Sequence, residues 1–385
     1  MARTLGIGIV GASGAFGRFI ASAIAELPDV ALIAVSGSHP ARTEQAARDL
    51  SVTRWFTDYS EFLTQPDIDI VVISTPPALH APMAIQAMRA GKAVFLEKPA
   101  ATSYEQGREL LLAQRDTGAR VLVDFVMRYN PLYTCLHEIA TRRIFGEPRR
   151  IDFTNNAGDE ALPPDHWFWD RRQSGGIFIE HGVHFFDAYG WITGALPRHV
   201  TGTTTTRHGT DQQDKVLATV VYENDSLGSY YHAFDKPSGL ERQIGLLAFD
   251  RGYARLDGWI AMDLDIEGLV NEEESEALGR MGFALNTAER YTGVQTRRRG
   301  NGLDYTVTRH MTGTLRHTED KERVYLSSVR DALNDLVSAV RDLAHRQQVT
   351  LWDGVLSSAI ACAASHPGDA TRFTDEVAWL TAMRP

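Results

Sequence analysis

Four ionisable side chains lie close together in the stretch GGIFIEHGVHFFD, residues 175–187, which otherwise holds glycine and apolar residues. If this stretch is helical, Glu180 and His184 stand four residues apart and share one face. A carboxylate placed there can orient an imidazole, and a histidine that titrates near neutral pH can accept a hydroxyl proton. Asp187 lies one turn further on, and His181 is rotated by about 100 degrees. We therefore assign both a structural hydrogen-bonding role.

A metal site is the alternative explanation for so many ligand-type residues. His181 and His184 are three residues apart, and the metalloprotease pattern, two histidines four apart around a glutamate, is absent. The two cysteines, Cys135 and Cys362, have no paired ligand spacing and are expected to be buried thiols. We predict no metal.

Lys98 is a second candidate for chemistry. It follows the apolar run AVFLE and precedes Pro99, which ends the expected strand. Ligands of open parallel sheets bind outside the carboxyl ends of the strands, so this position aims the ammonium into the ligand crevice. The alternative is a surface lysine that extends its charged end into water.

The glycines of GIGIVGASGAFGRFIASAI indicate a dinucleotide site. Gly11, Gly14 and Gly17 come directly after an expected strand and directly before an expected helix. They permit a tight turn and let backbone N–H groups at the helix start approach a pyrophosphate. The spacing is GxxGxxG rather than the commoner GxGxxG. The prediction of a dinucleotide site therefore depends on the position of the glycines between a strand and a helix.

The end of the second expected strand bears on the choice of cofactor. A site that prefers NAD presents Asp or Glu there, to the ribose hydroxyls, but this chain reads AVSGSHPAR. Ser36, Ser38, His39 and Arg42 can donate hydrogen bonds to a 2′-phosphate, and no acid repels it. The sequence therefore favours NADP over NAD.

The elements that must position these residues fall into three ranges. Residues 1–125 alternate short β-branched runs with helical segments, which predicts an α/β, doubly wound parallel sheet. Residues 126–325 add consecutive alternating runs, which predict an α+β domain with a large, mostly antiparallel open sheet. Residues 326–385 are expected to form helices. Residues 270–320 carry few periodic signals and receive no function, and the basic run 297–299 is expected in a solvated loop.

Four motifs together resemble the glucose-fructose oxidoreductase and inositol dehydrogenase family, Gfo/Idh/MocA. They are TPPALH at 75–80, EKP at 97–99, MRYNP at 127–131 and SGGIFIEHGVHFFD at 174–187. The resemblance implies a Rossmann domain, a second domain whose open sheet often forms an oligomer interface, and final helices that return towards the first domain. It also implies hydride transfer at one carbon of a sugar or cyclitol.

The resemblance places the family's active-site lysine at Lys98 and its catalytic histidine at His184. Where the family usually has Asp four residues before that histidine, this chain has Glu180. In chemical terms, Lys98 would stabilise the alkoxide and His184 would act as general acid or base. The assigned catalytic residues are Lys98, His184 and Glu180. The assigned cofactor-binding residues are Gly11, Ser13, Gly14, Ala15, Phe16, Ser36, Ser38, His39, Arg42, Thr75, Pro76, His80, Glu97 and Lys98.

The substrate-binding residues are expected on both sides of the crevice, and they are Lys98, Arg128, Tyr129, Trp167, Glu180 and His184. Two of these sets have alternatives. Asn130 before Pro131 is also a good helix start, so Arg128 and Tyr129 can belong to a cap. Trp167, together with Trp169 and Asp170, can form a stacking wall for a sugar ring or part of the core.

Composition narrows the classes of protein. The 385 residues are 43% hydrophobic and 23% charged, with no run long enough to span a membrane, and the net charge of -10 argues against a nucleic-acid partner. The absence of a secretory signal at the start predicts a cytoplasmic protein. We expect a homo-oligomeric NAD(P)-dependent oxidoreductase. The alternatives are a cofactor-binding sensor without turnover and a reductase of a non-sugar substrate.

Overall fold

The computed structural model describes residues 3–366, 368 and 370–384. Its first domain holds a six-stranded parallel sheet with the strand order β3-β2-β1-β4-β5-β6. The strands are β1 (Leu5–Val10), β2 (Val30–Ser36), β3 (Arg54–Phe56), β4 (Ile70–Ile73), β5 (Ala93–Leu96) and β6 (Val121–Val123). The order reverses between β1 and β4, and the crevice at such a reversal is where dinucleotides bind.

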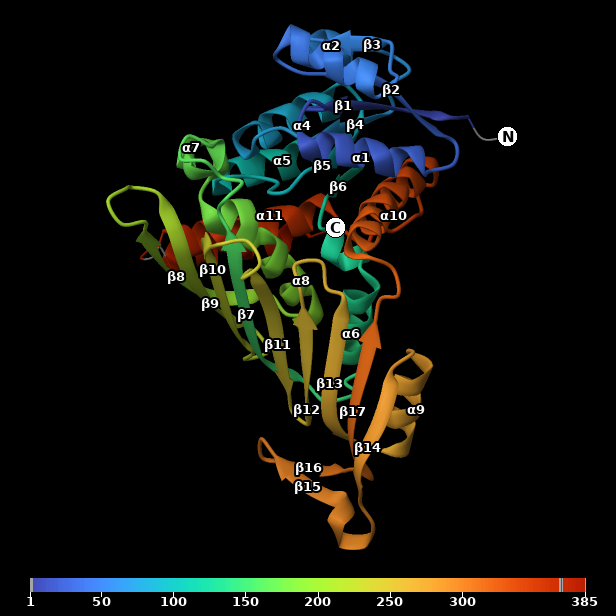
Figure 1. Cartoon of the computed structure of the whole chain (residues 1–385), viewed down its shortest axis with the longest axis vertical. Coiled ribbons are helices and arrows are strands. Elements are labelled where there is room, and N and C mark those ends of the chain that lie inside the picture. Colours follow the sequence, from blue (N-terminus) through green and yellow to red (C-terminus); the bar gives the residue numbers. More distant parts are fainter. Residues whose placement is uncertain (1–2, 367, 369, 385) are drawn as a thin grey trace.

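Helices cover both faces of this sheet (Figure 1). They are α1 (Ala15–Ala25), α2 (Pro40–Asp49), α3 (Tyr59–Leu63), α4 (His80–Arg89) and α5 (Tyr104–Thr117). β1, β4, β5 and β6 are buried along their whole length, as expected for strands between two helical layers. The doubly wound sheet predicted from the sequence is confirmed.

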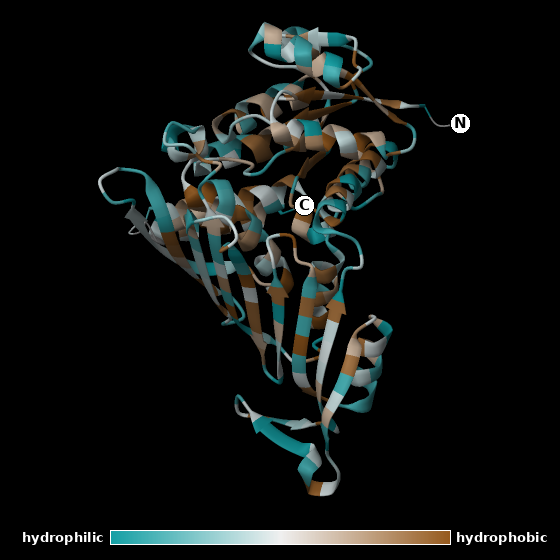
Figure 2. Cartoon of the chain, viewed as in Figure 1, coloured by the Kyte–Doolittle hydropathy of each residue, from teal (hydrophilic) through white to brown (hydrophobic). Residues whose placement is uncertain are grey.

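The second domain is built on a nine-stranded sheet with the order β14-β17-β13-β12-β11-β7-β10-β9-β8. Its strands are β7 (Pro148–Gly158), β8 (Pro197–Thr206), β9 (Gln213–Tyr222), β10 (Leu227–Lys236), β11 (Arg242–Phe249), β12 (Gly252–Asp257), β13 (Asp263–Val270), β14 (Ala284–Arg290) and β17 (Arg309–Arg316). Only the β7 and β10 pair runs parallel in the described sheet. The large, mostly antiparallel open sheet is confirmed, and its strands alternate in hydropathy (Figure 2).

Helices fill the space between the two sheets. The second domain contributes α6 (Pro131–Thr141), the short α7 (Arg171–Ser174), a π-helical turn (Phe178–Gly182) and α8 (Val183–Thr193). The C-terminal part contributes α10 (Lys321–Arg341), α11 (Leu351–Ser365) and α12 (Ala370–Ala382). α10 packs against α1, and α11 packs against both α5 and α8. The final helices therefore hold the two domains together.

Residues 270–320 form more regular structure than their sequence indicates. They contain α9 (Glu272–Arg280), β14, β17 and a two-stranded hairpin of β15 (Arg297–Gly300) and β16 (Leu303–Thr306). The hairpin projects from the far end of the second sheet (Figure 1) and is mostly hydrophilic (Figure 2). The prediction of a loop for the basic run was wrong, because cross-strand pairing with β16 orders it.

The helices of the described residues were compared with the length and hydropathy that a membrane span requires. None of these helices is both long enough and apolar enough to cross a bilayer.

Candidate active site

The glycine loop has the geometry that a pyrophosphate requires. Gly11 has φ +89°, and a Cβ there would stand 2.0 Å from the carbonyl oxygen of Ser74. A Cβ on Gly17 would stand 2.7 Å from the carbonyl oxygen of Gly11. Gly14 precedes the first turn of α1 and, with Ser13 and Ala15, is exposed. The start of α1 is therefore open to an anion, and the residues present fit a dinucleotide.

The end of β2 carries the residues that bear on the choice between NAD and NADP. Ser36 is buried, and its carbonyl oxygen accepts a hydrogen bond from the Gly11 N–H at 3.0 Å. Ser38, His39 and Arg42 are exposed at the start of α2. Arg42 makes no ion pair among the described residues, so its guanidinium is available to a ligand.

His80 ties together two loops at the carboxyl edge of the first sheet. Its Nδ1 lies 2.8 Å from the carbonyl oxygen of Pro99, and its Nε2 lies 2.7 Å from that of Thr75. Burial lowers the pKa of His80, although the two carbonyls favour the charged ring. The histidine therefore fixes the loop after β4 to the loop after β5. Its predicted contact with the cofactor stays a prediction, as do those of Pro76 and Phe16.

Lys98 joins the two domains at this edge. It follows β5 and precedes a cis bond to Pro99. Its Nζ donates to Glu180 Oε1 at 2.7 Å and to the Glu180 carbonyl oxygen at 2.9 Å. The two side chains are 15% and 14% exposed. An ammonium has three N–H donors, and no third acceptor is recorded among the described residues. One donor therefore remains for the oxygen of a substrate.

The π-helical turn explains why Glu180 faces the lysine. Gly175 and Gly176, both with positive φ, bring the chain into the turn Phe178–Gly182. A π-turn holds more residues than an α-turn, so positions four apart no longer align on one face. The expected contact between Glu180 and His184 is not formed in the described structure, and the Glu180 carboxylate bonds to Lys98 instead.

His184 begins α8 as a buried, neutral imidazole. It is 4% exposed, and its Nδ1 has no hydrogen-bond partner among the described residues. Burial lowers its pKa well below the usual value, and the charge of Lys98 lowers it further. The ring packs edge-on against Phe125 and Trp259, with centroids 6.1 and 5.7 Å away. A neutral imidazole beside an ammonium can accept a proton from a hydroxyl that the ammonium polarises.

Two further histidines surround His184. The rings of His181 and His232 lie 5.5 Å apart, and the His181 ring lies 6.2 Å from that of His184. Burial lowers the pKa of His181 to about 3 and that of His232 well below its usual value. Both nitrogens of His232 lack partners within the described chain. No group of three or more His, Cys, Asp or Glu side chains in residues 3–366, 368 and 370–384 is arranged to hold a metal ion.

Arg128 and Asp187 form a buried ion pair away from this cluster. Arg128 donates to both Asp187 oxygens, at 2.9 and 2.5 Å, and to Asp353 at 2.9 Å. Tyr129 donates to Asp335 at 2.6 Å. These bonds tie the loop after β6 to α8, α10 and α11. The structural role expected for Asp187 fits this geometry, whereas the substrate contacts assigned to Arg128 and Tyr129 stay predictions.

The tryptophan segment contributes both to the core and to a partly exposed surface. Trp167 is half-buried, with its ring centroid 5.3 Å from that of His166. Trp169 is buried and donates to the carbonyl oxygen of Leu162 at 3.1 Å. Asp170 caps α7. Trp169 and Asp170 are therefore structural, and Trp167 alone keeps its predicted role.

The structure adds three residues that the sequence argument missed. Asp124 directly follows β6 and is 1% exposed. Tyr325 on α10 lies 4.6 Å from Phe19 and 4.9 Å from Trp259, measured between ring centroids. Trp259 in turn contacts His184. An aromatic path thus runs from the glycine helix to the histidine. Asp124 was detectable as an acid at the end of an apolar strand.

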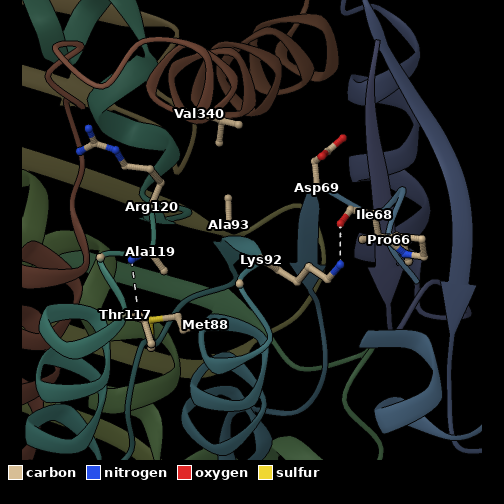
Figure 3. A pocket seen from close by; sticks show the side chains of 12 residues that line it. Pro66, Ile68, Asp69, Met88, Lys92, Ala93, Thr117, Ala119, Arg120 and Val340 are labelled. Carbon is tan, nitrogen blue, oxygen red and sulfur yellow. Dashed lines mark hydrogen bonds between the residues drawn. The ribbon is translucent and has the colours of Figure 1, made fainter. Parts of the chain in front are cut away.

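A separate cavity of about 370 Å³ lies at the opposite edge of the first sheet. Figure 3 shows Asp69 and Lys92 lining it beside Arg120 and Val340. Lys92 donates to the carbonyl oxygens of Gln65 and Ile68, at 2.7 and 2.9 Å. The Lys92 ammonium is thus bound by backbone carbonyl oxygens of its own domain.

Comparison with known proteins agrees with the fold. The family model described as "Oxidoreductase family, NAD-binding Rossmann fold" matches residues 5–125, and the "GFO/IDH/MocA C-terminal domain" matches residues 133–246. Together they cover more than half of the chain. The chain belongs to the GFO/IDH/MocA oxidoreductase family, as the motifs of its sequence indicate.

Individual relatives include dehydrogenases of cyclitols and sugars. The chain is 33% identical to scyllo-inositol 2-dehydrogenase (NAD(+)) of Bacillus subtilis, over 46% of this chain and 51% of that protein. It is 33% identical to inositol 2-dehydrogenase of Rhizobium meliloti, over 52% and 58%. The chain thus spans about half the length of these curated relatives. A levoglucosan dehydrogenase solved with NADH and L-sorbose has a TM-score of 0.77, with 20% identity over 97% of this chain and 98% of that one.

Proposed function

We propose that this protein is an NAD(P)-dependent dehydrogenase that interconverts a secondary alcohol and a ketone on a cyclitol, a sugar or a sugar derivative. The observation that carries the proposal is that Lys98, held by Glu180, and the buried His184, whose pKa is lowered by burial and by the charge of Lys98, lie near each other at the carboxyl edge of a dinucleotide-binding sheet. That edge is where a nicotinamide ring lies in this fold.

The two side chains divide the work of alcohol oxidation. When bound, the nicotinamide takes up the hydride that leaves the carbinol carbon. The free N–H of Lys98 donates to the substrate oxygen and stabilises its developing negative charge. His184 accepts the hydroxyl proton, so the carbon–oxygen double bond forms as the O–H and C–H bonds break. In the reverse direction His184 returns that proton to the ketone oxygen.

Glu180 is assigned to hold Lys98 in place rather than to touch the reacting carbon. Its carboxylate and its carbonyl oxygen both accept from Nζ, so they fix the direction of the remaining N–H. Because the bond joins two domains, it also sets the distance between the cofactor edge and α8. Glu180 is thus a positioning residue in this proposal.

The cofactor preference is a separate hypothesis. Ser38, His39 and Arg42 stand exposed where an acid would select NAD, which supports NADP. Against this, the relative from Bacillus subtilis is named for NAD(+), and the levoglucosan dehydrogenase was solved with NADH. Catalytic efficiency with the two cofactors decides the question. A higher efficiency with NADP supports the Arg42 assignment, and a higher efficiency with NAD overturns it.

The open face of the second sheet is proposed to join copies of the chain. Strand register puts four large, exposed side chains on that face, and they are Leu217, Leu227, Leu246 and Tyr253. Exposed apolar groups gathered in this way mark interaction surfaces. Analytical ultracentrifugation of the wild type should show a dimer or tetramer, and Tyr253→Glu should shift it towards monomer. A monomeric wild type would contradict the proposal.

A substrate screen tests the activity itself. The purified protein is assayed with NAD and NADP against inositols, aldoses, keto-sugars and lactones, with reduced-nicotinamide absorbance as the readout. Turnover with at least one polyol is expected, and it should vanish in Lys98→Ala. Tight cofactor binding with no reduction by any compound of the panel would favour a sensor instead.

A further inference from the structure

Two buried carboxyl groups meet directly beneath Lys98. Glu97 follows β5 and Asp124 follows β6, and the preceding residues, Leu96 and Val123, are paired in register. The backbone fixes both, because Asp124 N–H donates to Leu96 at 2.9 Å and Glu97 N–H donates to Ile73 at 3.0 Å. The side chains therefore stand next to each other at the carboxyl edge of the sheet.

These carboxyl groups lack the partners that a buried charge requires. Glu97 is 8% exposed and Asp124 is 1% exposed. Glu97 Oε1 and both oxygens of Asp124 have no hydrogen-bond donor among the described residues. The ammonium of Lys98 is nearby but bonds to Glu180. Two adjacent carboxylates in such a site cannot both stay ionised, because each charge raises the pKa of the other.

The pKa values of both carboxyl groups are raised, as expected for adjacent buried acids. Burial raises the pKa of Glu97 well above its usual value, and the charge of Asp124 raises it further. Burial also raises the pKa of Asp124, although its contact with Glu97 and the charge of Lys98 lower it. The other titratable groups whose fields reach the pair are Glu180, Tyr129 and Tyr325.

We propose that Glu97 and Asp124 share a single proton, and that their one remaining negative charge makes the crevice bind oxidised nicotinamide more tightly than reduced nicotinamide. This rests on the proposed function, since it assumes a nicotinamide ring at this edge. The oxidised ring is a cation and the reduced ring is neutral, so a fixed anion nearby favours the former. During alcohol oxidation the proton gained by His184 replaces the positive charge that the ring loses.

The shared proton is tested without cofactor, by infrared difference spectroscopy at neutral pH. Subtracting the spectrum of Glu97→Gln/Asp124→Asn from that of the wild type should reveal the carbonyl stretch of one protonated carboxylic acid. Asp69→Asn, at the opposite edge of the same sheet, should show only loss of a carboxylate. A wild-type spectrum without that protonated band in the difference would overturn the proposal.

The effect of the charge is tested by binding. The ratio of the Kd for reduced cofactor to the Kd for oxidised cofactor is measured by fluorescence titration and competition. Glu97→Gln/Asp124→Asn, which removes the charge, should lower this ratio about tenfold. Asp69→Asn, which removes a carboxylate at the opposite edge of the same sheet, should change the ratio by less than about twofold.

The ratio cancels any general loss of affinity in these variants. An unchanged ratio in the double variant would overturn the charge assignment. If no variant and no wild type binds either cofactor, the proposed function fails, and the infrared result still decides whether the proton is shared.

Discussion

The two ends of β5 carry two lysines with opposite fates. At the amino end, the ammonium of Lys92 is enclosed by the carbonyl oxygens of Gln65 and Ile68, beside the cavity in Figure 3. At the carboxyl end, Lys98 bonds to one residue of the other domain and keeps a donor free. The same side chain type is a structural tie at one edge and, in the proposed function, a catalytic residue at the other. Each ammonium has two acceptors among the described residues, so the lysines differ in where those acceptors lie: Lys92 bonds to backbone carbonyls of its own domain, and Lys98 bonds to the other domain at the edge where dinucleotides bind.

Other buried polar groups do differ in whether their atoms have partners. Arg128 is fully paired with Asp187 and Asp353, whereas the carboxyls of Glu97 and Asp124 and the rings of the histidine cluster keep unpartnered atoms. An unpartnered buried polar group costs stability. Many of the unpartnered buried atoms lie around Lys98 and the histidine cluster, which points to a site where a ligand supplies the missing partners. The predictions below test this division.

The largest expected effect is on turnover in Lys98→Ala. Loss of the ammonium removes the charge that stabilises the alkoxide, and kcat should fall about 1,000-fold, or ~4 kcal/mol of barrier. Steady-state kinetics with the best polyol measures this, and cofactor affinity should stay close to that of the wild type.

Lys92→Ala is the matched control at the other end of the strand. It removes the ammonium that donates to the carbonyl oxygens of Gln65 and Ile68, so it should lower the free energy of unfolding by about 1–3 kcal/mol. Activity per folded molecule should remain near the wild-type value. If the Lys92 variant loses turnover as Lys98→Ala does, the division between the two edges is broken.

The next largest effect is a loss of folding stability in Arg128→Met. This change leaves Asp187 buried without its partner, and it should lower the free energy of unfolding by about 3 kcal/mol in a urea titration. Arg198→Met, at an exposed pair with Asp225, should cost less than about 1 kcal/mol. A stable Arg128→Met protein with a raised KM would instead return Arg128 to the substrate site.

A smaller effect is on the pH dependence of stability in His232→Phe. Burial keeps the folded-state pKa of His232 far below its unfolded value, so only the unfolded chain takes up a proton below about pH 6.5. Stability is then lost as the pH falls through that value. Replacing the ring should lessen the loss between about pH 7 and about pH 5 by about 2 kcal/mol. Equal losses in the wild type and the variant would show that His232 is charged when folded.

The smallest effect is expected in Glu180→Asp. Shortening the side chain by one methylene takes its carboxylate out of reach of Lys98, while the backbone carbonyl bond remains. We expect kcat to fall about tenfold, since the lysine is held by one contact instead of two. Glu180→Gln keeps the length and should lose less positioning than Glu180→Asp. The reverse order would indicate that the charge of Glu180, rather than its reach, matters.

Local patterns predicted the first domain and its glycine loop, because strands, turns and helix starts depend on neighbouring residues. The same holds for Lys98, whose place at a strand end follows from Pro99. The partner of Glu180 was not predictable in this way. It depends on a π-turn that helical spacing does not reveal and on a contact between residues 82 positions apart.

Contacts through the C-terminal helices were also out of reach. Tyr325 and Trp259 show ordinary core patterns in the sequence, and only the packing of α10 against α1 brings them to the crevice. Asp124 carried a signal, an acid directly after an apolar strand. Its importance depends on Glu97 in the neighbouring strand, and strand order is a property of the whole sheet.

The most direct test of the central claim is a single-turnover measurement on His184→Ala. Wild-type and variant proteins, saturated with oxidised cofactor, are mixed with the best polyol, and the formation of reduced nicotinamide is followed by stopped-flow absorbance. The rate should fall by about 100- to 1,000-fold in the variant, with cofactor affinity unchanged. A variant that forms reduced nicotinamide at the wild-type rate would contradict the assignment of proton transfer to this histidine.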